Sequence, residues 1–454
     1  MFGILLEPPR GNHPAIARSP GDLLQSPPMP VSKEQAAEIL RRLGLRGTPA
    51  QLAARLQPTP ESRRAIPPDV PAARDPSAAG RDARLEFLRA RGASLSHLAG
   101  AAPAVDPTTF RGNIEQFIGM TQIPTGVIGP LRVNGLHAHG DFYVPLATSE
   151  GALVASYNRG ARVITRSGGA SCLATVAQVQ RAPGFVFDSI ADASQFAAWV
   201  SGEFQRCHDV AATRTRHGEL TDLHVHLETR TVYLLFSYHT GDASGQNMVT
   251  LCTDAICQDL VTRTPIPPRQ WFLESNLSGD KKATALNFLM TRGRKVTAEV
   301  TVPRALVEQM LHTTPELICD YWRLSFIAGV QSGSIGVTGH FANGIAALFL
   351  ACGQDVACVS EAAVGTNRFE RTESGDLYCG VDLPNVIAGT IGGGTRLPTA
   401  AECLRLIGCE GANTAAKFAE ICAAVVLGGE LSIAAALAAG DFARAHEQLG
   451  RPPA

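Results

Sequence analysis

Apolar positions along this chain follow two periods, which predict helices and strands in succession. Leucines at positions 85, 88, 95 and 98 have helical spacing, so residues 81–103 are expected to form an N-terminal helical segment. Residues 340–353 and 415–439 are runs of small apolar residues that predict long, closely packed helices. Residues 142–146 and 296–302 predict strands.

The segment between Pro183 and Phe272 has a pattern of its own. A helix is expected at residues 192–204, followed by strands at 220–227 and 231–238. A helix and neighbouring strands within about 90 residues predict an α+β unit.

A turn and a helix are expected on the N-terminal side of this unit. Residues 123–131 contain two prolines and two glycines between apolar anchors and predict a turn-rich segment. Residues 147–166 predict a helix with Thr148 or Ser149 as N-cap, so that Glu150 would lie in its first turn.

Residues 1–80 hold 14 of the 29 prolines. That density disfavours regular structure, because proline lacks a backbone donor. Between residues 31 and 45 there is no proline, and Ser32 and Gln35 have the spacing of a capping box. We therefore expect a flexible arm with one short helix.

Composition excludes several classes of protein. The 454 residues carry a net charge of −1, without the surplus of lysine and arginine that nucleic-acid binding needs. Hydrophobic residues make up 45% and charged residues 18%, which excludes wholesale disorder. The eleven cysteines include no Cys-x-x-Cys pair, which favours buried, reduced thiols in a cytoplasmic protein. The first ten residues do not have the pattern of a signal peptide.

Residues 324–354 carry no aspartate, glutamate, lysine or arginine. They do contain glutamine, histidine, asparagine and six glycines, and unpaired polar groups in a broken helix are costly in lipid. We interpret the stretch as buried protein interior, expect no other stretch to compete as a membrane span, and expect a soluble protein.

Two common site types lack their sequence motif. No Gly-x-Gly-x-x-Gly follows a strand, and no Gly-Lys-Ser/Thr loop occurs, so a Rossmann or P-loop nucleotide site is not indicated. Histidine pairs at 137/139 and 224/226 have strand spacing but no third ligand in register, so no metal site is expected.

Four polar clusters, centred on Glu150, Asp242, Lys281 and Asp355, interrupt apolar or glycine-rich sequence. Each has a structural alternative. Glu150 would suit a helix dipole, and Asp242 a hairpin loop. The residues around Lys281 could instead be a run of solvent-exposed charges, and Asp355 could be an acid in the loop that follows a helix.

The ordered set of these clusters and their neighbours resembles one family between about Arg81 and Arg451. The matching segments are Glu115-Gln-Phe-Ile-Gly, Ile123-Pro-Thr-Gly-Val-Ile-Gly-Pro-Leu, Ala147-Thr-Ser-Glu-Gly, Asn158-Arg-Gly, Gly241-Asp-Ala-Ser-Gly-Gln-Asn-Met, Asp280-Lys-Lys, His340-Phe-Ala-Asn, Ala351-Cys-Gly-Gln-Asp, Gly389-Thr-Ile-Gly-Gly-Gly-Thr and Gly429-Glu-Leu-Ser. The sequence resembles the 3-hydroxy-3-methylglutaryl-CoA reductases. Its Asp-Lys-Lys form resembles class I, without the membrane anchor.

The resemblance implies an α+β fold in two parts. A large helical domain with a long central helix, residues 104–182 and 274–450, would bind the acyl-CoA. A smaller ferredoxin-like α/β domain, residues 183–273, would be inserted into it and bind NADP(H). A homodimer or homotetramer with active sites between subunits is implied.

The implied reaction is the reduction of 3-hydroxy-3-methylglutaryl-CoA to mevalonate and CoA, in isoprenoid precursor synthesis. Two hydride transfers would come from NADPH, with NADH less favoured. By resemblance, Lys281 stabilises the oxyanion and Glu150 donates a proton. Asp355 would bridge and tune these two groups, and His446 would protonate the departing CoA thiolate.

Binding residues are implied by the same match. The hydroxymethylglutaryl group would be held by Arg181, Asp280, Lys282, His340 and Asn343, and CoA by Ser156, Asn158 and Arg159. The cofactor would be held by Asp242, Ala243, Ser244, Gly245, Gln246, Asn247 and Met248, by Gly392, Gly393, Gly394 and Thr395, and by Arg216 at the 2′-phosphate.

The chain also departs from the family pattern. Glu115-Gln116 stands where the family has the Glu-Asn dimer motif. Ser244 and Gln246 stand where methionine is usual, and Ile387-Ala388 where an acid is usual.

Two alternatives stay open. One is a homologue that reduces a different branched acyl-CoA. The other is a catalytically inactive relative that binds CoA, which predicts the loss of at least one proposed catalytic residue. All four of them, Glu150, Lys281, Asp355 and His446, are present.

Overall fold

The computed structural model describes residues 40, 41 and 43–442. The chain divides into two units, Met1–Arg46 and Gly47–Ala454. Few residues of the first unit are described, so the fold below is that of the second. His446 and most of the helix expected at residues 31–45 lie outside the described residues.

From residue 47 onward the chain differs from the expected flexible arm. Helices α2 (Pro49–Leu56) and α3 (Ala78–Arg89) and the short turns η2 (Glu61–Arg63) and η3 (Pro107–Phe110) form here. Arg55 Nε donates to the Gly135 carbonyl at 3.0 Å, and the Thr59 amide to the Gly168 carbonyl at 2.8 Å. These long-range bonds satisfy polar groups that proline-rich sequence cannot pair locally. The helix expected in residues 81–103 corresponds to α3.

Ten strands of the described chain form one connected sheet, antiparallel except where β1 pairs with β3. The strands are β1 (Thr125–Gly135), β2 (His139–Ala147), β3 (Ala170–Arg181), β4 (Gly184–Val186), β5 (Glu219–Glu228), β6 (Thr231–His239), β7 (Gln270–Phe272), β8 (Gly293–Val302), β9 (Thr366–Arg371) and β10 (Leu377–Val386). The main path is β7-β4-β6-β3-β8-β10-β9, with β5 beside β6 and β2 beside β1.

Strand β3 joins two parts of this sheet. Its first part pairs with β8, and its last three residues, Val179 to Arg181, pair with β6. The strands expected at 220–227 and 231–238 are β5 and β6. The helix expected at 192–204 is two helices, because a turn at Ser201 and Gly202 ends the first of them.

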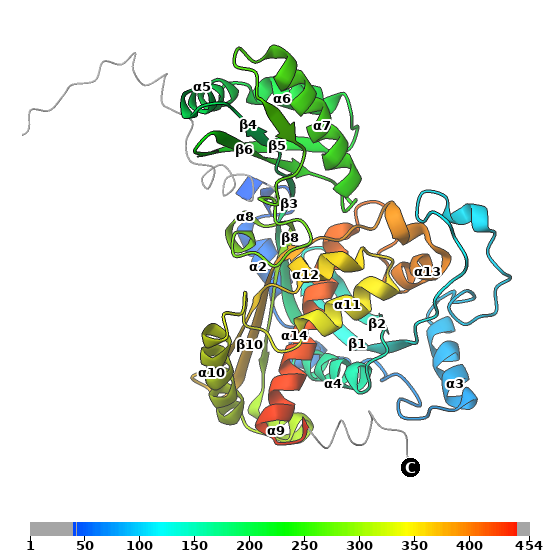
Figure 1. The fold of residues 1–454 in the computed structure, drawn as a ribbon. Helices are drawn as coiled ribbons and strands as arrows, with labels where there is room; N and C mark the ends of the chain where they lie inside the picture. Colours follow the sequence, from blue (N-terminus) through cyan, green and yellow to red (C-terminus); the bar gives the residue numbers. More distant parts are fainter. Residues whose placement is uncertain (1–39, 42, 443–454) are drawn as a thin grey trace, which may run out of the picture. The chain divides into compact units, whose positions relative to one another are not determined.

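The remaining helices are α4 (Leu153–Arg166), α5 (Ile190–Val200), α6 (Phe204–Ala212), α7 (Gln246–Arg263), α8 (Asn287–Met290), α9 (Arg304–Leu311), α10 (Pro315–Gln331), α11 (Phe341–Ala351), α12 (Val359–Ala362), α13 (Pro398–Leu406) and α14 (Ala415–Ala438). Among them, α5, α6 and α7 lie around β4, β5 and β6, whereas α4, α11 and α14 lie together in the other part of the fold (Figure 1). Helices α5 and α6 pack on β5, whereas α4, α11, β8 and β10 all contact α14.

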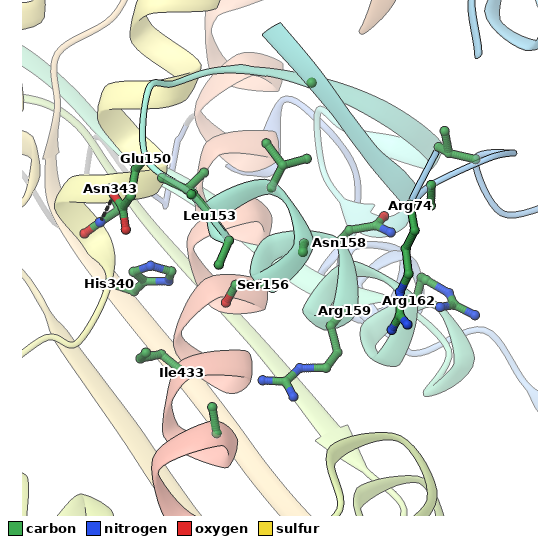
Figure 2. A pocket seen from close by; sticks show the side chains of 18 of the residues that line it. Arg74, Glu150, Leu153, Ser156, Asn158, Arg159, Arg162, His340, Asn343 and Ile433 are labelled. Carbon is green, nitrogen blue, oxygen red and sulfur yellow. Dashed lines mark hydrogen bonds between the residues drawn. The ribbon is translucent and has the colours of Figure 1, made fainter. Parts of the chain in front are cut away.

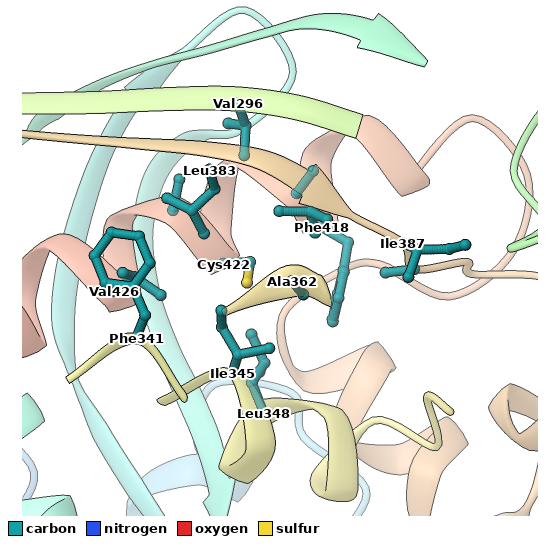
Figure 3. Packing of buried hydrophobic residues seen from close by; sticks show 14 of the residues in the cluster. Val296, Phe341, Ile345, Leu348, Ala362, Leu383, Ile387, Phe418, Cys422 and Val426 are labelled. Carbon is teal, nitrogen blue, oxygen red and sulfur yellow. The ribbon is translucent and has the colours of Figure 1, made fainter. Parts of the chain in front are cut away.

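Helix α14 is the centre of the core. Figure 3 shows Phe418, Cys422 and Val426 of this helix facing Phe341 and Ile345 of α11. A Cβ atom at Gly160 of α4 would overlap the Gly428 backbone of α14, so glycine is required where these two helices touch. All eleven cysteines are free and buried, as expected.

Among the described helices, α14 is the one long and apolar enough to cross a membrane, yet 83% of its apolar window is buried inside the protein. The expectation that no stretch would compete with residues 324–354 is therefore wrong. That stretch is also only partly interior: α11 is buried, but Leu324 and Val330 of α10 are 69% and 60% exposed.

Two local expectations are corrected near α4. Residues 125–131, expected as turns, belong to β1. Helix α4 begins at Leu153 and not at residue 147, because Ala152, its N-cap, has a φ of +67°. Glu150 thus lies in the turn that precedes the helix.

Candidate active site

A groove of about 1390 Å³ runs beside α4, between the start of α11 and the end of α14. In Figure 2, Glu150, His340 and Asn343 lie toward one end of it, and Arg74 and Arg162 toward the other. The groove therefore has a hydrogen-bonding end and a basic end.

Glu150 and Asn343 are paired at the first end. Asn343 Nδ2 donates to Glu150 Oε2 at 2.6 Å, and the Glu150 carboxylate is exposed to the groove. The turn that presents it is fixed by the Thr148 hydroxyl, which accepts from the Glu150 amide at 3.0 Å. An exposed carboxyl beside an amide donor can exchange a proton with a bound molecule.

His340 is the N-cap of α11 and is buried against Tyr157, with the two rings stacked at 4.7 Å. Tyr157 Oη donates to the His340 carbonyl at 2.5 Å. Burial lowers the pKa of His340, which favours the neutral ring. Its Nδ1 is buried and has no hydrogen-bond partner in the described part of the chain.

The backbone at His340 is held by Glu430, a residue that the sequence reasoning did not single out. Its carboxylate, buried in α14, accepts from the amides of Gly339 and His340. Burial raises the pKa of Glu430, although these amides act in the opposite direction. The available signal was a single acid within the apolar Gly429-Glu-Leu-Ser segment.

The three residues expected to bind CoA all line the groove, and each also has an internal bond. Ser156 Oγ donates to Ser432 Oγ at 3.0 Å, and Arg159 Nη2 to the Ser432 carbonyl at 2.7 Å. Asn158 Oδ1 accepts from the Gly129 amide at 2.9 Å. These bonds orient the three side chains from α14 and β1.

A second cluster surrounds Lys281, away from these groove residues. Lys281 Nζ lies 2.8 Å from Asp355 Oδ2, and this hydrogen bond raises the pKa of the half-exposed lysine. The backbone of Lys281 has a φ of +55°, a left-handed conformation that costs a non-glycine residue about 1 kcal/mol or more. Lys282, its exposed neighbour, donates to the Asp280 carbonyl at 2.9 Å.

The Asp280 carboxylate accepts hydrogen bonds from two arginines. It lies 3.1 Å from Arg181 Nη1 and 2.6 Å from Arg292 Nη2. Burial alone would raise the pKa of Asp280, but Arg292 and Arg181 outweigh it and the pKa is lowered. Arg181 also contacts Glu274 at 3.1 Å.

Arg292 and its buried neighbour Glu361 were missed by the sequence reasoning. Both side chains are completely buried, with Arg292 Nε 3.2 Å from Glu361 Oε2. Burial raises the pKa of Glu361 to about 7, although Arg292 acts to lower it. Neither residue belongs to the four polar clusters named above, and Arg292 lies in Thr291-Arg-Gly-Arg-Lys, a run that has the pattern of a solvated charge run.

The structure separates Glu150 from Lys281. Asn343, the partner of Glu150, is near the start of α11, and Asp355, the partner of Lys281, follows its end. The helix between Asn343 and Ala351 spans about 12 Å. Within the described residues of one chain, no hydrogen bond or ion pair joins Glu150 to Lys281 or Asp355. Asp355 pairs with Lys281 and accepts from the Ala357 amide at 3.0 Å, and its role as a bridge to Glu150 stays a prediction.

The two loops expected to bind the cofactor lie against each other. The Thr390 amide donates to the Asp242 carbonyl at 2.8 Å, and a Cβ atom at Gly389 would collide with the backbone of Ser244. Glycine is therefore required at 389. Gly392 and Gly393 both have positive φ, carry no side chain and face open space, so their backbone can be approached by a ligand.

The carboxylate of Asp242 has a structural partner. It accepts from the amides of Asn413 and Ala415 at 2.6 and 3.0 Å, at the N-terminus of α14. This position caps the central helix. The rest of the loop, from Ala243 to Met248, leads into the start of α7.

Arg216 lies exposed in the loop before β5. Two residues further, a Cβ atom at Gly218 would overlap the thioether of Met248. The loop that carries Arg216 thus lies against the start of α7, beside the expected cofactor loop. His446 lies outside the described residues.

Comparison with known proteins identifies the family. The family model described as hydroxymethylglutaryl-coenzyme A reductase matches residues 80–451. The 3-hydroxy-3-methylglutaryl-coenzyme A reductase of Methanothermobacter thermautotrophicus is 44% identical over 371 residues, 81% of this chain and 92% of that protein. The enzyme of the same name from Pyrococcus abyssi is 43% identical over 377 residues, 81% of this chain and 91% of that protein.

The chain belongs to the hydroxymethylglutaryl-coenzyme A reductase family.

A solved structure of this family has a similar fold. It is the class II 3-hydroxy-3-methylglutaryl-CoA reductase of Streptococcus pneumoniae bound to NADPH, with a TM-score of 0.63 over 80% of this chain and 97% of that chain. At 20% identity this likeness shows the fold alone: helices and an antiparallel sheet arranged as in a hydroxymethylglutaryl-CoA reductase. It does not support the expected resemblance to class I.

Proposed function

We propose that this protein reduces 3-hydroxy-3-methylglutaryl-CoA to mevalonate and CoA, with two molecules of NADPH. The observation that carries the proposal is the position of Lys281. A lysine held by Asp355 is linked, through Asp280, Arg292 and Gln246, to the start of the helix that follows the glycine-containing loop. A cation next to a cofactor loop suits hydride transfer to a carbonyl, because negative charge develops on the oxygen.

Each side chain has a distinct task in this proposal. Lys281 donates a hydrogen bond to the developing oxyanion, and Asp355 keeps it protonated and oriented. Glu150 gives a proton to the aldehyde oxygen in the second reduction, while Asn343 fixes its carboxyl. His446 protonates the CoA thiolate, as the resemblance implies.

Binding residues come from the groove and from the cluster around Lys281. His340 and Asn343 of the groove, with Arg181, Asp280 and Lys282 of that cluster, hold the hydroxymethylglutaryl group. Ser156, Asn158 and Arg159 hold CoA, and the position of His340 and Asn343 at one end of the same groove supports this placement of the acyl group.

NADPH supplies the hydride when bound. The residues present fit such a cofactor, because the backbone at Gly392 and Gly393 can be approached by a ligand and Asp242 to Met248 form the facing loop. Arg216 would hold the 2′-phosphate. In this arrangement residues 183–273 form the inserted, ferredoxin-like NADP(H)-binding domain, and residues 104–182 and 274–450 the acyl-CoA domain.

The active site is completed, we propose, between two subunits of a homodimer or of a homotetramer built from dimers. The proposal is supported by the separation of Glu150 from Lys281 within the chain. It is also supported by exposed apolar side chains in the segment that resembles the family's dimer motif: Ile114, Ile118 and Met120 are 51%, 101% and 56% exposed. Covering such residues in an interface would be favourable.

The finer assignments rest on sequence. The class I form is supported by the Asp280-Lys281-Lys282 segment alone. A cytoplasmic location is supported by the buried, unpaired cysteines.

Purified protein should oxidise two NADPH for each 3-hydroxy-3-methylglutaryl-CoA consumed and form mevalonate, detected by mass spectrometry. Other branched acyl-CoA esters, assayed at the same concentration, test the alternative substrate. A higher kcat/KM for one of them, or no NADPH oxidation with any, would sink the proposed function.

A further inference from the structure

Gln246 makes a contact that methionine, the residue usual at this position in the family, has no oxygen to make. It is the first residue of α7, directly after the glycine that caps this helix. Its Oε1 accepts a hydrogen bond from Arg292 Nη2 at 2.8 Å. The glutamine thus creates a polar link between the cofactor loop and the body of the protein.

Arg292 depends on this link for its orientation. In the described residues its guanidinium makes hydrogen bonds through Nη2 alone, to Gln246 Oε1 and to Asp280 Oδ1. Glu361 neutralises its charge at 3.2 Å without hydrogen-bond geometry. A fully buried arginine with so few directed partners is sensitive to the loss of either one.

The other partner of Arg292 leads directly to Lys281. Asp280 precedes it in the chain, and the left-handed backbone of Lys281 persists only if its neighbours hold it. The Glu361 carboxyl also lies close to this loop, because the backbone amide of Lys281 is one of the groups that lower its pKa. Movement of Arg292 would therefore be transmitted to the lysine.

We propose that Gln246 is a positioning residue for Lys281, acting through Arg292 and Asp280. These contacts fix the position of the start of α7 relative to the loop that carries Asp280 and Lys281. A cofactor that orders the first turn of α7 also orders the lysine that acts on its acceptor. This inference rests on the proposed function.

The steady-state test uses Gln246→Met, a change close in size that removes the acceptor oxygen. We expect kcat to fall by about tenfold, while the KM for NADPH changes by less than about twofold. Gln258→Met is the matched control, since Gln258 is an exposed residue of the same helix. A raised KM with unchanged kcat would overturn the proposal and leave Gln246 as a cofactor contact only.

A second test needs no activity. Amide hydrogen exchange of residues 276–283 in the free protein should be faster in Gln246→Met than in the wild type. It should stay at the wild-type rate in Gln258→Met, and also in Gln246→Glu, which keeps an acceptor for Arg292. Unchanged protection in Gln246→Met overturns the link, whereas an inactive wild type with the expected exchange pattern overturns the proposed function alone.

Discussion

Lys281 shows how much one side chain depends on its partners. Its ammonium group forms an ion pair with Asp355 at 2.8 Å. Its backbone is left-handed, and the residue before it, Asp280, is held by hydrogen bonds from two arginines. The ammonium group is thus oriented before any substrate binds, which is the condition under which an oxyanion donor is most effective.

We expect Lys281→Ala to lower kcat by about 10² or more, the scale for the loss of one oxyanion donor. Binding of CoA, measured by calorimetry, should be nearly unchanged, because the CoA-binding residues line a different part of the structure. Turnover within about threefold of the wild type would remove Lys281 from the mechanism.

Glu150 and His446 should separate the two reductions. His446→Gln should cripple thioester reduction, which must expel a thiolate, and retain much of the activity on free mevaldehyde. Glu150→Gln should damage mevaldehyde reduction, because an amide has no acidic proton to give. Both substrates are assayed with both variants at neutral pH. Equal losses on both substrates in His446→Gln would show that His446 is not a dedicated thiolate acid.

Arg216 should decide the choice of cofactor. Arg216 lies in the loop beside Met248, and its guanidinium can donate two parallel hydrogen bonds to one phosphate. Arg216→Ala should therefore raise the KM for NADPH much more than that for NADH. Arg214→Ala, in the same exposed loop, is the control. A wild type that prefers NADH would refute the assignment.

At the scale of elements, α14 organises the site through its polar groups. Its N-terminus is capped by Asp242 of the cofactor loop, Glu430 holds the backbone of His340, and Ser432 holds Arg159. Glu420, a third polar side chain of α14, is buried and accepts from the amides of His137 and Ala138 at 2.8 and 2.6 Å. One helix thus links the proposed cofactor loop to the groove.

Glu420 gives a stability prediction with a definite sign. Burial raises its pKa from 4.5 to about 7, although backbone amides oppose the shift. The folded state then binds more protons than the unfolded state between these values, so the free energy of unfolding falls as pH rises through them. The contribution is at most about 1.4 kcal/mol per pH unit.

Denaturant unfolding at fixed protein concentration, from about pH 5 to pH 7, measures this slope. Glu420→Gln should flatten it relative to the wild type. Glu373→Gln, at an exposed position, should leave it unchanged. An identical slope in Glu420→Gln and wild type would show that Glu420 does not titrate in this range.

At the scale of the whole molecule, the two halves of the proposed site lie at opposite ends of α11 in one chain. A two-fold dimer can bring Glu150 of one subunit to Lys281 of its partner. The symmetry then repeats the same contact with the subunits exchanged, so that the dimer has two equivalent sites. The exposed apolar residues Ile114, Ile118 and Met120 offer a surface for such an assembly.

Complementation tests this arrangement. Glu150→Gln and Lys281→Ala chains, each inactive alone, should regain activity when co-expressed. Random pairing gives half heterodimers with one intact site of two, so about a quarter of wild-type activity is expected. No recovery in co-purified heterodimers would place both residues in a site of one chain.

The sequence by itself determined the strongly periodic elements. Residues 340–353, 415–439, 220–227 and 231–238 form the elements expected. The two helices are runs of small apolar residues that are buried on most sides, and the two strands show the strand pattern in their sequence. The ordered motifs also determined the family, which the family model and the archaeal relatives confirm.

Tertiary structure decided what local pattern does not encode. The start of α4 was shifted by the left-handed Ala152, and proline-rich sequence after residue 47 found its hydrogen-bond partners on the distant strand β1. Buried Arg292 and Glu361 became neighbours through chain segments about 70 residues apart, a pairing set by packing and not by spacing. Likewise, the separation of Glu150 from Lys281 follows from the length and position of α11. A sequence motif identifies the side chains of a site but does not give the distances between them.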